Sequence, residues 1–287
     1  MAEPLADSPN AREVQFWNSA ATRPWAELHE PIDRLFTGLT QVVLELAAPL
    51  PGERAIDIGC GSGTTVLDLA RRVGPTGYVL GADISQHSLE KARERITAAG
   101  LSQAEVSLCD VSTQTFAADS FDLAFSRFGV MFFADPTATF INLRRGMRHP
   151  GRLTFAVFRT PQENPWGTAP FAAVRHLLPP MKPPGPEETG QFSWAGPTRV
   201  RRILEGAGFE DISLTRHDPA MRLAGPGGAA EAADFAMTIG PIAHALSNAS
   251  APKPEAVRSS LEVFFRSHDS QQGIVLPGAL WIVRAHA

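Results

Sequence analysis

Apolar side chains recur at spacings of three and four residues in the stretch that precedes the first glycine-rich turn. The positions with this spacing are Ile32, Leu35, Phe36, Leu39, Val42, Val43 and Leu46. This period matches one face of a helix, so the segment predicts an amphipathic helix with one buried side. The helical pattern extends over residues 12–48, and Pro51 with Gly52 ends it.

Beyond residue 52, short apolar runs alternate with segments of helical period. The runs that predict strands are RAIDIG, GYVLGAD, AEVSLCD, FDLAFSRF and GRLTFAVF, starting at residues 54, 77, 104, 121 and 151. Helices are predicted between them, with Ser85 as an N-cap, Gly100 at a helix end, and a helix from Pro136 to about His149. This alternation indicates a parallel sheet with helices on both faces, whose ligands bind at the carboxyl ends of the strands.

The alternation of apolar runs with segments of helical period ends after residue 158. A stretch rich in proline and glycine comes first and predicts an ordered excursion or lid over the edge of the sheet. A helix (PTRVRRILEGAGF), a strand (EDISLTRH), a largely helical insert over residues 225–270 and a final strand (GALWIVRAHA) follow. We expect the two late strands to complete the sheet as an antiparallel pair. The predicted organisation is a helical cap over 1–50, a cofactor-binding core over 51–160, and the rest of the same domain over 161–287.

Composition narrows the range of functions. Hydrophobic residues make up 44% of the chain, enough for a packed core, and the formal net charge is −4 with acidic and basic residues interspersed. This balance lacks the basic face expected of a nucleic-acid-binding protein. The two cysteines, Cys60 and Cys109, cannot form a closed zinc site unaided, so no metal is expected. The start of the chain lacks a signal-peptide pattern and no membrane-spanning run occurs, which predicts a cytoplasmic protein.

The strongest motif follows the first predicted strand. Gly59, Gly61 and Gly63 form G-x-G-x-G, one residue shorter than the G-x-G-x-x-G of dinucleotide-binding turns, and Asp57 stands two residues before the first glycine. A helix N-terminus after such a turn favours anions, but a nearby carboxylate disfavours a diphosphate and favours an ammonium group. The motif therefore predicts a nucleoside cofactor with a cationic end and no phosphates.

Two further acidic residues end the next two predicted strands. Asp83 stands at the end of GYVLGAD, where a carboxylate can accept hydrogen bonds from both hydroxyls of a ribose. Asp110 ends AEVSLCD and is placed to accept from the exocyclic amine of adenine. Asp57 and Asp110 could also simply cap turns, as aspartate often does. Three acids at three successive strand ends around one glycine turn favour the adenosine site.

The segments IDIGCGSGTT, GADIS, CDV and FDLAFSRFGVMFF occur in this order. Together they resemble class I S-adenosylmethionine-dependent methyltransferases, in particular the small-molecule group that includes the ubiquinone and menaquinone methyltransferases. The resemblance covers about residues 53–160. It implies a Rossmann-like, doubly wound α/β fold with a seven-stranded sheet, mostly parallel with an antiparallel last strand, plus an N-terminal helical cap and a helical insert.

The resemblance also implies a set of cofactor-binding residues: Asp57, Gly59, Gly61, Gly63, Asp83, Ile84, Asp110, Val111, Ser126 and Arg127. Asp57 would hold the amino group of S-adenosylmethionine through the loop, directly or by a water molecule. The glycines would let its methionine portion approach the backbone. Ile84 would pack on the adenine, the Val111 amide would meet an adenine nitrogen, and Ser126 with Arg127 would line the methionine end.

The methyl acceptor is harder to predict. Aromatic residues are frequent in the N-terminal segment and after the fourth strand, which points to a small, largely apolar or aromatic acceptor. Trp25 could face the sulfonium, while Phe128, Met131 and His29 are candidate acceptor-facing residues. No residue stands out as catalytic, because methyl transfer from an activated donor depends mainly on alignment. An oxygen acceptor is the first expectation, then carbon, then nitrogen, and Arg127 could instead anchor an anionic acceptor.

Other functions remain open at this level. A nicotinamide-dependent oxidoreductase would share the sheet but not the glycine spacing. A non-catalytic S-adenosylmethionine-binding module would keep the same cofactor loop. Methylation of RNA is disfavoured for two reasons. SRFGVMFF follows the fourth strand where an asparagine-proline-proline-aromatic motif would be expected, and no basic stripe is present. The chain could also form a homodimer.

Overall fold

The computed structural model describes residues 5, 8–180, 185, 188–247 and 254–287. Its centre is a seven-stranded sheet in the order β3-β2-β1-β4-β5-β9-β6. The strands are β1 (Arg54–Ile58), β2 (Tyr78–Asp83), β3 (Ala104–Leu108), β4 (Phe121–Arg127), β5 (Met147–Phe158), β6 (Glu210–His217) and β9 (Leu280–His286). Strands β1 to β5 run parallel, and β9 lies antiparallel between β5 and β6. The predicted Rossmann-like sheet with an antiparallel last strand is confirmed.

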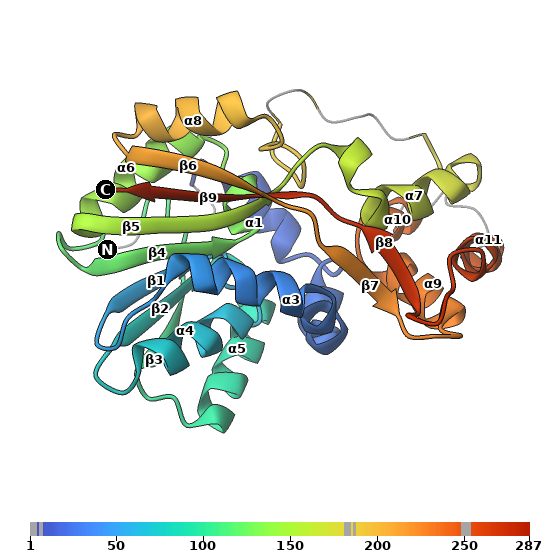
Figure 1. Cartoon of the computed structure of the whole chain (residues 1–287), viewed down its shortest axis with the longest axis horizontal. Helices are drawn as coiled ribbons and strands as arrows, with labels where there is room; N and C mark the ends of the chain where they lie inside the picture. Colours follow the sequence, from blue (N-terminus) through green and yellow to red (C-terminus); the bar gives the residue numbers. More distant parts are fainter. Residues whose placement is uncertain (1–4, 6–7, 181–184, 186–187, 248–253) are drawn as a thin grey trace.

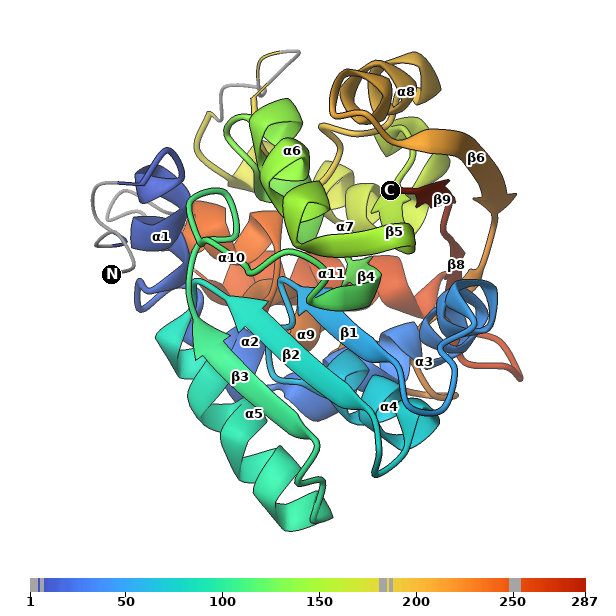
Figure 2. The same ribbon diagram turned by 90° about the vertical axis from the view of Figure 1, so that its left-hand side faces the viewer.

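Helices cover both faces of the sheet. In Figure 1, α3 (His29–Ala47), α4 (Thr64–Val73) and α5 (Gln86–Ala99) lie below it, whereas α6 (Pro136–Gly146) and α8 (Pro197–Gly206) lie above. The predicted N-cap is confirmed, since the Ser85 hydroxyl accepts from the Ser88 amide at 3.4 Å. Figure 2 shows the same layers from the side, with α5 packed along β3. Helix α6 ends three residues before the predicted His149, because Met147 already pairs with Phe121 as the start of β5.

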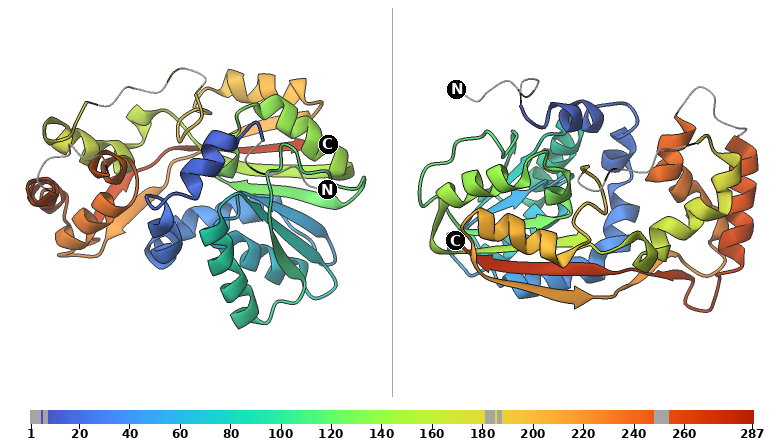
Figure 3. Two further views of the ribbon diagram at one scale, coloured as in Figure 1. Left: turned by 180° about the vertical axis from the view of Figure 1, so that it is seen from behind. Right: turned by 90° about the horizontal axis from the view of Figure 1, so that it is seen from above.

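The N-terminal segment is not one helical unit. It divides into α1 (Ala11–Trp17), α2 (Arg23–Glu27) and α3, with a break that the Thr22 hydroxyl stabilises by contacting the carbonyl oxygens of Phe16, Trp17 and Ser19. Helix α3 is more than a cap, because its C-terminal half packs on β4 and β5 and includes the fully buried side chains of Val43 and Leu44. Figure 3 shows α1 and α2 between the sheet and the C-terminal insert.

The insert forms a second lobe with its own hydrophobic cluster. A long antiparallel ribbon leads into it, because β6 continues into β7 (Ala220–Ala224) and β8 (Ile274–Pro277) continues into β9 (Figure 3). Helices α7 (Pro165–Val174), α9 (Ala229–Thr238), α10 (Pro241–Leu246) and α11 (Pro254–Arg266) complete the lobe. Short 3₁₀ turns connect elements of the described chain, among them η2 (Gly129–Phe132), η3 (Pro161–Glu163) and η4 (Arg175–Leu177). The mainly helical insert is confirmed, but the separate β7–β8 pair was not predicted.

A buried asparagine fixes the point where the second lobe joins the sheet. The Asn164 side chain is fully buried, and its amide nitrogen donates to the carbonyl oxygens of Thr160 and Ala279, each at 3.0 Å. Its oxygen accepts from the Ala279 amide at 2.9 Å. The lobe is thereby held over the carboxyl ends of the parallel strands. None of the helices in the described ranges is long and apolar enough to span a membrane.

Candidate active site

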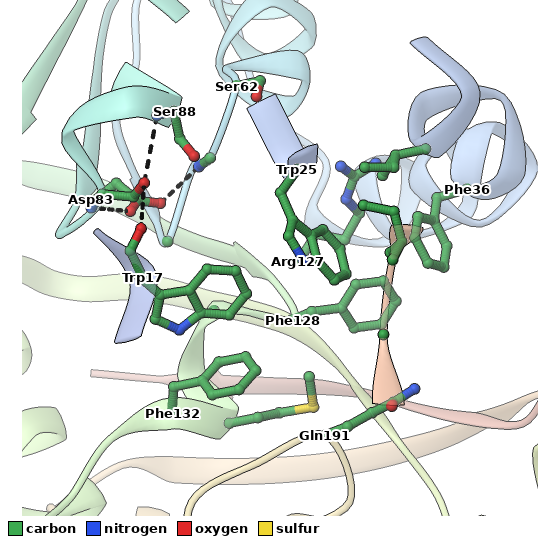
Figure 4. A pocket seen from close by; sticks show the side chains of 18 of the residues that line it. Trp17, Trp25, Phe36, Ser62, Asp83, Ser88, Arg127, Phe128, Phe132 and Gln191 are labelled. Atoms are coloured by element: carbon green, nitrogen blue, oxygen red, sulfur yellow. Dashed lines mark hydrogen bonds between the residues drawn. The ribbon is translucent and has the colours of Figure 1, made fainter. Parts of the chain in front are cut away.

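A cavity of about 320 Å³ lies where the carboxyl ends of β1 to β4 meet α1 to α3 and the second lobe (Figure 4). Most residues that the sequence predicts for the site line this cavity: Trp25, His29, Gly59, Gly61, Asp83, Ile84, Asp110, Val111, Arg127, Phe128 and Met131. Three others, Asp57, Gly63 and Ser126, are not part of its lining. The topology therefore brings together residues separated by about a hundred positions in the chain.

The three glycines have two different roles. A Cβ on Gly59 would lie 2.6 Å from Gly129 Cα, and one on Gly63 would lie 2.9 Å from Ala92 Cβ, so both glycines allow close packing within the protein. Gly61 alone has open space where a Cβ would stand. All three have positive φ, which disfavours other residues. Gly63 makes room for α5, and the predicted approach of the methionine portion to the three glycines stays a prediction.

Asp83 is held in a fixed orientation at the end of β2. Its Oδ2 accepts from the Gly61 amide at 2.7 Å and its Oδ1 accepts from the Ser85 amide at 2.8 Å. Figure 4 shows the carboxylate at the wall of the cavity, close to Ser88 and the glycine turn. Burial raises the pKa of this carboxyl, while the backbone hydrogen bonds from Ser85 and Gly61 oppose the rise. A carboxylate offers about four acceptor positions, so two remain for a ligand.

Asp57 lies beneath the glycine turn instead of in the wall of the cavity. Its side chain is fully buried, and Oδ2 accepts a hydrogen bond from the Thr65 hydroxyl. Oδ1 has no hydrogen-bond partner among the described residues. Burial raises the pKa of Asp57 to about 7, with the Thr65 hydrogen bond and the Arg127 charge acting against the rise. Thr65 does line the cavity, so Asp57 can influence a ligand through this hydroxyl.

Asp110 is occupied in part by the N-terminal segment. The Asn10 amide nitrogen donates to both carboxylate oxygens of Asp110, at 2.9 and 3.0 Å, and the Ser112 amide donates to Oδ1 at 2.9 Å. Asp110 is 3% exposed and lines the cavity together with Asn10. Neither Asn10 nor its contact could be inferred from local sequence pattern.

Ser126 has a structural role where the sequence suggested a ligand contact. It is fully buried, its hydroxyl donates to the Ile58 carbonyl at 2.7 Å, and it accepts from the Gly129 amide at 3.1 Å. These bonds connect β4 to the end of β1 and fix the backbone that packs against Gly59. The predicted contact of Ser126 with the methionine end is thus not supported by its position outside the cavity lining.

Arg127 is a partly buried cation of the cavity wall, with 14% of its side chain exposed. Its Nη1 donates to the Thr40 hydroxyl at 2.7 Å, and its guanidinium lies 5.6 Å from the ring centre of Phe36. The nearest carboxylate, Asp33, is 3.9 Å from Nη2 but is held more closely by Arg95 at 2.9 Å and by the Thr64 hydroxyl at 2.5 Å. Burial lowers the pKa of Arg127. Its charge is therefore only partly compensated within the protein.

Aromatic rings form two walls of the cavity (Figure 4). On one side Trp17 meets Trp25 and Phe132 edge to face, with ring centres 5.7 and 5.3 Å apart. On the other side Phe128 stacks on Phe158 at 4.3 Å. Phe128 has a φ of 73°, a conformation that costs free energy and is concentrated at functional sites. The walls can hold a flat apolar ligand.

His29 lies at the start of α3 and lines the cavity. Its Nδ1 is 3.1 Å from the Ala26 carbonyl oxygen. Because a carbonyl only accepts, this contact requires the proton on Nδ1 and leaves Nε2 of the neutral ring as an acceptor. The described residues contain no cluster of histidine, cysteine and acidic side chains that could bind a metal.

Comparison with known proteins identifies the family. A family model described as a methyltransferase domain matches residues 50–185. The chain is 32% identical over 208 residues to the aklanonic acid methyltransferase DauC of Streptomyces sp. strain C5, a match that covers 69% of this chain and 90% of that protein. It is 28% identical over 196 residues to the nocamycin O-methyltransferase of Saccharothrix syringae, covering 65% and 70% of the two chains.

A solved structure shares the fold. It is the phosphoethanolamine N-methyltransferase 2 of Haemonchus contortus in complex with S-adenosyl-L-methionine, with a TM-score of 0.57, 14% identity, and coverage of 97% of this chain and 60% of that one. The chain thus belongs to the class I S-adenosylmethionine-dependent methyltransferases. It is an enzyme, and its methyl donor is S-adenosylmethionine. We therefore prefer a methyltransferase to the two alternatives that the sequence left open, a nicotinamide-dependent oxidoreductase and a non-catalytic S-adenosylmethionine-binding module.

Proposed function

We propose that the cavity binds S-adenosylmethionine with its ribose at Asp83, its adenine between Ile84, Asp110 and Val111, and its methionine end over Gly61. Asp83 suits the ribose because two acceptor positions of its carboxylate are free for two hydroxyls. Gly61 suits the methionine end because open space lies where its side chain would stand.

Two charged residues complete the proposed donor site. The methionine carboxylate pairs with Arg127, whose cation is only partly compensated by Asp33. The amino group lies above Thr65, whose hydroxyl transmits the negative potential of Asp57. When bound, the donor supplies a methyl group on a positively charged sulfur, and Trp25 presents a ring to that charge.

The acceptor is a small, largely apolar or aromatic molecule that binds on the side of the second lobe. The observation that carries this proposal is the chemistry of that wall, since the residues that the lobe contributes are nearly all apolar: Pro170, Leu223, Phe235, Ala236, Ile239, Ile242 and Phe265. An apolar pocket with few polar groups selects a lipophilic ligand. The two relatives named for aklanonic acid and for O-methylation of nocamycin support a small acceptor and an oxygen nucleophile.

The residues of the chain promote transfer chiefly by alignment. The Phe128–Phe158 stack and the Trp17–Trp25 wall hold a flat acceptor against the donor and exclude water, and alignment of this kind can contribute about 7–11 kcal/mol. For a hydroxyl acceptor, His29 Nε2 takes the proton as the oxygen bonds to the methyl carbon. Bound S-adenosylmethionine would supply the methyl group, and its sulfur would keep the electron pair of the carbon–sulfur bond.

Isothermal titration calorimetry with S-adenosylhomocysteine, followed by an acceptor screen with mass detection, tests this function. We expect micromolar binding of the nucleoside and a mass gain of one methyl group on a flat phenol or carboxylic acid. The Ala236→Phe variant is the matched control, because it fills the acceptor side and should abolish transfer while keeping nucleoside binding. Loss of nucleoside binding in that variant would contradict the placement of the donor at the strand ends and of the acceptor beside the second lobe. A cytoplasmic location, the absence of a nucleic-acid partner and a homodimer stay predictions.

A further inference from the structure

Asn10 is a polar residue with an unusual use of its side chain. It occupies the N-cap position of α1, where an asparagine ordinarily accepts a hydrogen bond from an amide of the first helical turn. Here the side chain makes no such bond. Its nitrogen instead donates to Asp110 and, at 3.3 Å, to the Ser112 hydroxyl, and its oxygen accepts from the Ala134 amide at 2.7 Å. The Asn10 side chain therefore makes these contacts instead of capping α1.

These contacts control how Asp110 can receive a ligand. Oδ1 accepts from both Asn10 and the Ser112 amide, so both of its acceptor positions are used. Oδ2 accepts from Asn10 alone, which leaves one position. No cationic side chain pairs with Asp110 in the part of the chain that the structure describes, and both Asn10 and Asp110 are at least 96% buried. A single N–H donor from the cavity therefore completes the carboxylate.

We propose that Asn10 is a positioning residue for recognition of the nucleobase: it turns Asp110 so that the remaining Oδ2 position accepts one N–H of the adenine amine. This inference rests on the proposed placement of adenine at Asp110. Without Asn10, the carboxylate can rotate and can accept from water, so its bond to the amine loses its directional advantage.

The other end of α1 provides a natural comparison. Asn18 follows the helix, and its side chain donates to the Ile84 carbonyl at 2.8 Å and accepts from the Gln86 amide at 2.9 Å. Helix α1 has no fully buried side chain, so these two asparagines are main attachments of the helix to the loops after β2 and β3. Loss of either should loosen α1, but only Asn10 touches Asp110.

The test is calorimetric titration with two ligands, S-adenosylhomocysteine and its analogue in which the purine lacks the exocyclic amine. We expect the unaltered enzyme to prefer the amine-bearing ligand about tenfold. Asn10→Ala should reduce the preference to less than about threefold, mainly because it weakens the binding of S-adenosylhomocysteine. Asn18→Ala should weaken both ligands by the same factor and leave their ratio unchanged. Asn10→Ser provides a second variant. Serine is a good N-cap for α1, but its side chain is too short to reach both carboxylate oxygens of Asp110.

The Asp110→Ala variant separates the two levels of the proposal. If Asp110→Ala removes the preference while both Asn10 variants retain it, the role of Asn10 is overturned and the adenine placement stands. If Asp110→Ala itself keeps the tenfold preference, the adenine placement is wrong and the inference fails with it. Equal weakening of both ligands in Asn10→Ala and Asn10→Ser would also overturn the role of Asn10, since it would show that the residue serves α1 alone.

Discussion

The Thr65 hydroxyl donates a hydrogen bond to one oxygen of the buried Asp57 carboxylate, directly beneath the glycine turn. The other oxygen has no partner within the described ranges. A fully buried carboxylate with one hydrogen bond is costly to ionise, which explains why its pKa rises to about 7. Asp57 therefore connects the stability of the core with the electrostatics of the donor site.

Asp57 should make the ligand-free enzyme less stable as the pH rises. Its pKa is higher in the folded state than the ordinary 3.8, so the folded protein holds this proton more tightly than the unfolded chain. The stabilisation is complete below about pH 3.8 and is lost as the pH rises to about 7, with a total cost of at most roughly 4 kcal/mol. Asp57→Asn should raise the Tm more at pH 8 than at pH 5 and should weaken S-adenosylhomocysteine. An equal change of Tm at both pH values would contradict this assignment.

Replacement of Asp83 should impair donor binding strongly. Asp83→Ala removes the acceptor of the Gly61 amide and the two free positions assigned to the ribose. We expect at least about a hundredfold weaker S-adenosylhomocysteine in calorimetry, since charge-assisted hydrogen bonds of this kind contribute about 1.5–3 kcal/mol each. Asp68→Ala, on α4 beside Arg71, is the control and should change affinity less than about twofold. Comparable losses in the two variants would show that general negative charge, and not the ribose contact, matters.

Gly61 and Gly63 form a matched pair with opposite expected effects. A Cβ at residue 63 would lie 2.9 Å from Ala92 Cβ, so Gly63→Ala should lower the Tm by several degrees through a clash with α5. A Cβ at residue 61 meets open space, so Gly61→Ala should be the milder substitution for stability, although its φ of 52° still carries some strain. Gly61→Ala should instead weaken S-adenosylhomocysteine more than tenfold. Thermal melts and calorimetry on both variants check the two halves independently.

Arg127 should discriminate ligands by their carboxylate. Arg127→Gln keeps a donor near Thr40 but removes the positive charge. We expect it to weaken S-adenosylhomocysteine by tenfold or more and to leave its decarboxylated analogue nearly unchanged. The opposite pattern, in which donor affinity is preserved and the KM of an anionic acceptor rises, would place the carboxylate of the acceptor at Arg127.

His29 should affect the transfer step more than binding. His29→Ala removes Nε2 as the proton acceptor, so kcat for a hydroxyl acceptor should fall about a hundredfold at neutral pH, within the range for general bases. The affinity for S-adenosylhomocysteine should change little. An unchanged kcat would exclude His29 as the base.

The cofactor half of the site was accessible to sequence reasoning because it follows from periodicity and strand order. Parallel strands share one carboxyl edge, so acids that end consecutive strands must converge there, as Asp83 and Asp110 do. The N-cap at Ser85 and the helix end at Gly100 are local properties, and local pattern predicted them. Local pattern did not predict contacts between side chains and residues that lie far away in the sequence.

The sequence by itself thus determined the sheet, its helices and the class of cofactor, because these depend on the alternation of apolar runs and on residue types at strand ends. Only the tertiary structure decided that Ser126 joins β1 to β4, that Gly63 makes room for α5, and that Asn10 bonds to Asp110. The physical reason is the same in each case. These contacts join positions far apart in the chain, up to 100 residues for Asn10 and Asp110, and no local period records which distant partner a side chain will meet.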